Sequence, residues 1–90
     1  MNDREFPGAD VVAAGIADLE RGVESIPALL VSIGYARLRK CGLQIPAPIH
    51  APEKQLYLLL AERDPRRAHS EYNSWLRRLI SFERAAECAG

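Results

Sequence analysis

The sequence predicts an all-helical protein, a compact four-helix bundle that is either orthogonal or up-and-down, and three observations lead to this fold class. Apolar residues recur at helical spacing in four separate stretches. Proline and glycine stand between these stretches, where they begin and end helices. The sequence has no alternating β-branched run and no Asn-Gly turn, the patterns typical of strands. We expect a single helical domain over residues 10–88, after a frayed N-terminal segment, residues 1–9.

The first two predicted helices are bounded by residues that favour helix ends. Asp10 is the expected N-cap of the first helix, and the apolar face that follows it is formed by Val12, Ile16, Leu19 and Val23. Gly22 is the expected stop of this helix. Ser25 is the expected N-cap of the second, which the periodicity predicts as one long helix ending at Gly42. It is apolar around much of its circumference, so we expect it to be the central, most buried helix.

Residues 43–52 read Leu-Gln-Ile-Pro-Ala-Pro-Ile-His-Ala-Pro, and we call this segment the strap. Its three prolines exclude a regular helix interior. Ile45 and Ile49 make it too apolar for an ordinary solvated loop. We expect an extended strap between the second and third helices that packs across the bundle. The alternative is an exposed segment that docks in a partner's groove.

The last two predicted helices are separated by Asp64-Pro65. Pro52 opens the third helix, and the fourth begins either at Pro65 or near Asn73 and runs to about Cys88. One face of the fourth helix collects the residues that a core needs, Tyr72, Trp75, Leu76, Leu79, Phe82 and Ala86.

Composition and charge exclude several classes of protein. The formal net charge is zero, which argues against a general nucleic-acid binder. The N-terminus lacks the pattern of a signal peptide and every apolar run is short, so we expect a cytoplasmic protein without membrane contact. The two cysteines fit reduced thiols, with a Cys41–Cys88 bridge as the alternative. The cysteines and histidines lack the close pairs that preorganise zinc, so we expect no metal and no cofactor.

Charge is unevenly distributed along the chain. Residues 1–25 hold six acids and two bases, whereas residues 26–84 hold ten bases and five acids. The two regions either attract each other, within the fold or between subunits, or the basic region binds an acidic partner.

One short motif suggests chemistry. In Arg63-Asp64-Pro65-Arg66-Arg67-Ala68-His69 an arginine is followed six positions later by a histidine. These seven residues resemble the arginine–histidine motif of HEPN ribonucleases, which are also all-helical. The resemblance implies that Arg63 would stabilise the charge of the scissile phosphate and that His69 would assist proton transfer. No Ser-His-Asp set, glycine-rich phosphate loop or carboxylate pair accompanies it.

Two other interpretations concern binding. Gly34 could form the turn of a helix-turn-helix, with the basic helix end Arg37, Arg39 and Lys40 facing DNA phosphates, although the unbroken apolar stripe favours one long helix. Aromatic and arginine residues of the fourth helix, together with the strap isoleucines, are binding candidates: Tyr72, Trp75, Arg77, Arg78, Ile45 and Ile49. The leading hypothesis is a non-catalytic protein–protein interaction or oligomerisation module, a subunit or regulator of a larger bacterial-type complex, that binds another protein or itself.

Overall fold

The computed structural model describes residues 6–89, and within this range the protein is all-helical, as predicted. It has five helices where four were expected: α1 (Ala9–Glu20), α2 (Ile26–Ile33), α3 (Tyr35–Lys40), α4 (Pro52–Arg63) and α5 (Ala68–Ala89). None of these helices is long and apolar enough to cross a lipid bilayer.

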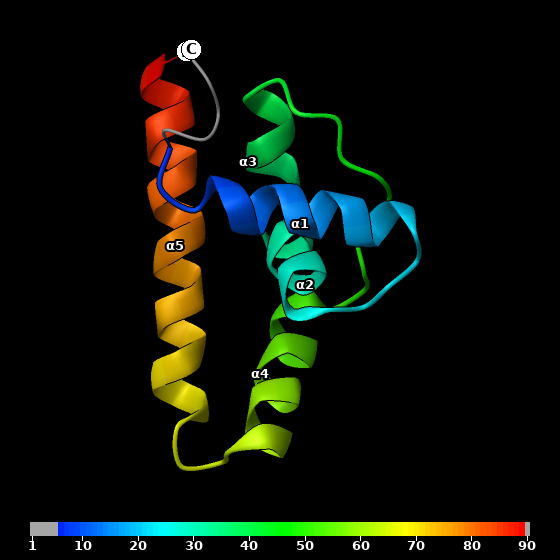
Figure 1. Cartoon of the computed structure of the whole chain (residues 1–90), viewed down its shortest axis with the longest axis vertical. Helices are drawn as coiled ribbons and strands as arrows, with labels where there is room; N and C mark the ends of the chain where they lie inside the picture. Colours follow the sequence, from blue (N-terminus) through cyan, green and yellow to red (C-terminus); the bar gives the residue numbers. More distant parts are fainter. Residues whose placement is uncertain (1–5, 90) are drawn as a thin grey trace.

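The α2 to α5 helices run roughly along the long axis of the molecule, and α1 lies across them (Figure 1). The α4 and α5 helices run antiparallel on either side of a short turn (Figure 1). The α3 helix follows α2 in nearly the same direction, and both lie beside the C-terminal half of α5 (Figure 1). The α1 helix lies crosswise over α2, with its first residues against α5 (Figure 1). The Cα radius of gyration is 12.7 Å, close to the value of about 12 Å expected for a compact chain of this length.

The α1 helix begins earlier than the sequence predicted. Its N-cap is Gly8 and not Asp10, which lies in the first turn and adds negative charge where the helix dipole favours it. Gly8 has a left-handed conformation with φ 79°, and a Cβ at this position would lie 2.7 Å from the backbone oxygen of Arg78. Only glycine satisfies both conditions, so the close contact with α5 determines where the helix starts. The helix stops before Gly22, as predicted.

The segment expected to be frayed, residues 1–9, is only partly covered by the structure. Residues 1–5 lie outside the described residues. Phe6 packs edge-to-face on Phe82 of α5, with ring centroids 5.8 Å apart, and Ala9 already belongs to α1. Ordered packing therefore extends N-terminally at least to Phe6.

The α2 helix is the centre of the core, as its two apolar stripes predicted. Leu29, Leu30 and Val31 are at most 2% exposed. The predicted cap is present, because the Ser25 hydroxyl accepts a hydrogen bond from the backbone N–H of Ala28 at 3.2 Å. The crossing with α1 is close because a Cβ on Gly15 would lie only 2.3 Å from the backbone oxygen of Pro27.

The prediction of one helix from Ser25 to Gly42 is wrong at Gly34. This residue ends α2 and begins α3, with φ −87° and ψ 11° in place of helical values. Helical hydrogen bonds still span the junction, from Gly34 N–H to the Leu30 oxygen and from Leu38 N–H to the Gly34 oxygen, so it is a kink without a separate turn. Its cause is tertiary packing, because a Cβ on Gly34 would lie 2.8 Å from Glu83 Oε2 of α5.

The strap packs across the bundle, as the leading interpretation predicted. Leu43, Ile45 and Ile49 are half-buried against the core. The backbone N–H of Ile49 donates to the Ser32 hydroxyl at 3.0 Å, and this hydroxyl donates to the backbone oxygen of Ala28 at 2.8 Å. The buried Ser32 side chain therefore fastens the strap to α2.

The turn between α4 and α5 is organised by Asp64. Its carboxylate accepts a hydrogen bond from the backbone N–H of Arg66 at 3.1 Å, and its backbone oxygen accepts one from Arg67 at 3.1 Å. As predicted, α4 begins at Pro52 and ends before Asp64. The α5 helix begins at Ala68, between the two expected starts at Pro65 and Asn73.

Candidate functional site

The predicted binding residues of α5 lie on different sides of that helix. The guanidinium of Arg78 stacks over the Trp75 ring, 4.8 Å from its centroid, and lies 3.6 Å from a carboxylate oxygen of Asp10. Trp75 is half-buried against the core. This group joins α5 to the first turn of α1, so its contacts are used within the fold.

Tyr72 also makes its contacts within the protein. Its ring packs edge-to-face on Tyr57 of α4, with centroids 5.7 Å apart. Burial, and secondarily the charge of Glu53, raises the pKa of the Tyr72 hydroxyl. Arg77, by contrast, is exposed and points away from this pair toward another surface. Tyr72, Trp75, Arg77 and Arg78 therefore do not form one patch.

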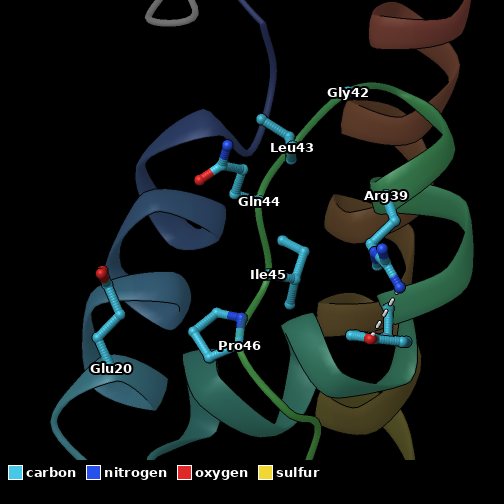
Figure 2. A pocket seen from close by; sticks show the side chains of 8 residues that line it. Glu20, Arg39, Gly42, Leu43, Gln44, Ile45 and Pro46 are labelled. Carbon is cyan, nitrogen blue, oxygen red and sulfur yellow. Dashed lines mark hydrogen bonds between the residues drawn. The ribbon is translucent and has the colours of Figure 1, made fainter.

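The strap isoleucines are separated from these α5 residues. Ile45 lines a wide, shallow hollow of about 660 Å³ in which the strap runs between Glu20 of α1 and Arg39 of α3 (Figure 2). Arg39 donates a hydrogen bond to the Tyr35 hydroxyl at 3.1 Å and lies 5.5 Å from the centroid of that ring. Ile49 contributes to the core and not to this hollow. The cation in the lining of this hollow, Arg39, already contacts Tyr35. The strap isoleucines are half-buried, so they present little apolar surface to a partner.

Arg63 and His69 stand on either side of the turn between α4 and α5. Both residues are exposed, and no hydrogen bond joins them within residues 6–89. The His69 ring nitrogen Nε2 lies 3.3 Å from the Asn73 side-chain nitrogen. General acid–base chemistry needs a proton donor or acceptor positioned against a bound substrate, and the turn presents these two side chains on an open surface.

The basic end of α3 is largely engaged within the protein. Arg37 donates to Glu87 Oε2 at 2.6 Å through Nε and to Glu83 Oε1 at 3.1 Å through Nη1. Arg39 is held by Tyr35, as described above. These contacts hold Arg37 and Arg39 against neighbouring side chains, so Lys40 is left as the freer cation of the predicted DNA-binding set.

Glu83 is the functional candidate that the sequence pattern missed. Its side chain is 4% exposed beneath the Gly34 kink. Burial raises the pKa of its carboxyl group, and Arg37 partly offsets this effect. The hydrogen bond from Arg37 lowers the pKa of Glu87. The i, i+4 spacing of the two glutamates, with Glu83 on the apolar face beside Phe82, is the signal that could have identified the cluster.

Cys41 lies beside this ionic cluster but has no partner thiol. Burial, followed by the charges of Glu87 and Glu83, raises the pKa of the Cys41 thiol, which disfavours the reactive thiolate. Both Cys41 and the exposed Cys88 are free thiols. Within residues 6–89 no three His, Cys, Asp or Glu side chains are grouped so that they could hold a metal ion. The arrangement fastens α3 to α5 through charge.

A hollow of about 380 Å³ lies beside the ionic cluster and is lined by Lys40, Cys41, Gly42, Ala86 and Glu87. Two further hollows have partly apolar linings that include an exposed aliphatic residue. The first, which we call the α4 hollow, has a volume of about 240 Å³ and is lined by Glu24, Leu29, Gln55, Leu58, Leu59 and Glu62. The second, the α5 hollow, has a volume of about 480 Å³ and is lined by His69, Ser70, Asn73, Leu76, Arg77 and Ile80. Leu58 is 52% exposed and Ile80 is 36% exposed. Only Arg77 and His69 of the α4 and α5 hollows were singled out from the sequence.

Each of these two hollows combines an exposed aliphatic side chain with charged neighbours. The ionic cluster and the Trp75 face make their contacts within the chain. Comparison with protein families, curated proteins and solved structures found no match for this chain.

Proposed function

We propose that this chain is a non-catalytic protein-interaction module that binds another polypeptide through the α4 hollow. The observation that carries the proposal is the exposure of Leu58. Leu56 and Leu60 on the opposite face of α4 are at most 1% exposed, whereas Leu58 is 52% exposed. Leu58 lies on the face of α4 that carries Lys54 and Glu62, away from the core, so packing of α4 against its own bundle does not account for it.

Single exposed leucines are common on protein surfaces and need no partner. Leu58 differs because it borders a hollow whose lining includes Leu59 and Leu29. A partner side chain placed there would remove Leu58 and the exposed part of Leu59 from water together. Because Leu58 is 52% exposed, its burial is worth about half of the full leucine value, or about 0.8–1.5 kcal/mol, which corresponds to a factor of roughly 4 to 13 in affinity.

The test is site-specific photo-crosslinking. A photoreactive residue at position 58, in the full chain within its native cells, should give adducts with a defined polypeptide. The same residue at Lys40, which is exposed on α3 and lines neither the α4 hollow nor the other partly apolar hollow on α5, serves as the control. Leu58→Asp should weaken binding of the identified polypeptide about tenfold or more and leave the free energy of unfolding within about 0.5 kcal/mol of wild type. Equal labelling from positions 58 and 40 would contradict the proposal.

A further inference from the structure

We infer that the polypeptide bound by the α4 hollow is a second copy of this chain, which contributes its α5 hollow. This inference rests on the proposed function and names the partner and the partner's surface. Three features of the two hollows support this inference: their charges, their exposed aliphatic residues and their positions on the fold.

The charges of the two hollows are complementary. Glu24 and Glu62 are the charged residues in the lining of the α4 hollow, which contains no base. Arg77 is the charged residue in the lining of the α5 hollow, which contains no acid and includes His69. Within the described residues, none of Glu24, Glu62 and Arg77 forms a salt bridge, so these charges are available to a partner. Such complementarity orients two surfaces and excludes like-charged alternatives.

The aliphatic residues of the two hollows are also matched. Leu58 is the most exposed large hydrophobic residue described, and Ile80 is exposed beside Leu76 in the other hollow. Docking one hollow on the other would remove both side chains from water in the same contact. The ion pairs would then surround an apolar centre, which is the usual anatomy of a protein interface.

The two hollows belong to different parts of the fold. One is formed by α4 with Leu29 of α2 and Glu24 of the connection between α1 and α2, and the other by α5 alone, and they share no residue. Docking therefore joins unlike surfaces. A contact between unlike surfaces leaves one free hollow of each kind at the ends, so the association extends to a chain or closes into a ring.

The expected affinity is modest. A stable interface of standard size buries about 800 Å² on each partner, which is roughly one seventh of the 5786 Å² surface of this chain. The hollows provide only the centre of such an area. We therefore expect association in the micromolar range, weakened by salt because its rim is ionic.

The experiment measures the solution mass of the full chain by sedimentation velocity, up to several hundred micromolar and at low salt. Wild type should form dimers and larger species. Glu62→Arg and Arg77→Glu should each weaken association at least tenfold, and the double variant should regain most of it because the pair is restored in reverse. Lys40→Glu is the matched charge-reversal control, since Lys40 is exposed on α3 and lines neither hollow.

A mixing experiment tests whether unlike surfaces meet. Leu58→Asp and Ile80→Asp should each be monomeric alone, and their mixture should stop at a one-to-one dimer with a single intact interface. Leu58→Gln and Ile80→Gln replace either variant whose circular dichroism departs from wild type.

Two results would overturn the inference. In the first, the wild-type chain stays monomeric at every concentration while position 58 still crosslinks a different protein. This result would exclude a second copy as the partner and leave the proposed function intact. Self-association that is insensitive to Arg77→Glu would place the contact on another face.

Discussion

Glu83 has a carboxylate that is almost completely removed from water, on the helix face that otherwise forms the core. Its contacts include an ion pair with Arg37 at 3.1 Å and close approach to the Gly34 backbone. Burying a charge is unfavourable unless a partner compensates it, and here the partner is itself partly exposed and shared with Glu87. The compensation is therefore incomplete, which is why burial dominates and raises the pKa of Glu83.

This raised pKa predicts a pH dependence of stability. A carboxyl group that binds its proton more tightly in the folded state contributes stability below its unfolded pKa, near 4.5, and loses this contribution as the pH rises through the folded pKa. Glu83→Gln removes this titration. We expect the free energy of unfolding of wild type, relative to Glu83→Gln, to fall as the pH rises above about 4.5.

Urea denaturation of both proteins between pH 4 and pH 8 measures this difference. The lowered pKa of Asp18 acts in the opposite direction in both proteins and cancels in the comparison. Glu87 shares Arg37 with Glu83, so the difference reports on Glu83 together with its effect on Glu87. A difference that stays constant with pH would show that Glu83 titrates as an exposed glutamate does.

Residues were predictable where their role is local. Ser25 as a cap and Gly22 as a stop depend on a few neighbours, and both are present as predicted. Asp10 was assigned as a cap because its residue type favours that position, but contact between Gly8 and α5 moved the helix start. Glu83 was missed for a related reason, because its burial depends on a helix almost fifty positions away in the sequence.

The kink between α2 and α3 shows the same limit for elements. The apolar stripe continues through Gly34, so periodicity alone predicts one helix. The departure from helical geometry arises where Leu79 and Glu83 of α5 press on a position without a side chain. The strap was predictable because its composition excludes both a helix and a solvated loop. Its attachment to Ser32 was not, since that serine lies in the interior of another helix.

This attachment predicts the effect of Ser32→Ala. The change leaves the Ile49 N–H without its acceptor in a partly buried position, and we expect a loss of about 1–2 kcal/mol in the free energy of unfolding. The amide proton of Ile49 should exchange with solvent faster than in wild type. Ser81→Ala, on the exposed face of α5, is the control and should change stability by less than about 0.5 kcal/mol. Slow exchange at Ile49 in Ser32→Ala would mean that other contacts hold the strap.

The candidate binding residues were only partly predictable. Residue type correctly identified Arg77 as an exposed cation without showing which surface it serves. Tyr72 and Trp75 fit two interpretations, because their spacing is that of a core face and their residue types are common in interfaces. The contacts described for them lie within the fold. The hollow beside Leu58 was not predictable because it forms only where Glu24 and Leu29, from other parts of the chain, meet α4.

At the scale of the whole molecule, the uneven charge along the chain is only partly used within the fold. Arg78 and Asp10 join the basic α5 to the acidic α1 at 3.6 Å. The contacts of Arg37 with Glu83 and Glu87, and that of Arg21 with Asp18, form instead within one region of the chain. Charge complementarity therefore remains between Glu24 and Glu62 on one surface and Arg77 on another, where a second copy can use it.

Self-association through these surfaces predicts that thermal stability depends on protein concentration. Binding that occurs only in the folded state stabilises it by mass action. With a dissociation constant of about 10 μM, raising the concentration from about 1 to about 100 μM adds roughly 1 kcal/mol, which should raise the unfolding midpoint by about 4–8 °C for a domain of this size. Differential scanning fluorimetry across this range measures the shift. Leu58→Asp should have the same midpoint at every concentration, and high salt should reduce the wild-type shift because it screens the ionic rim. A wild-type midpoint that does not change with concentration would mean that the folded chain stays monomeric over this range, which contradicts self-association.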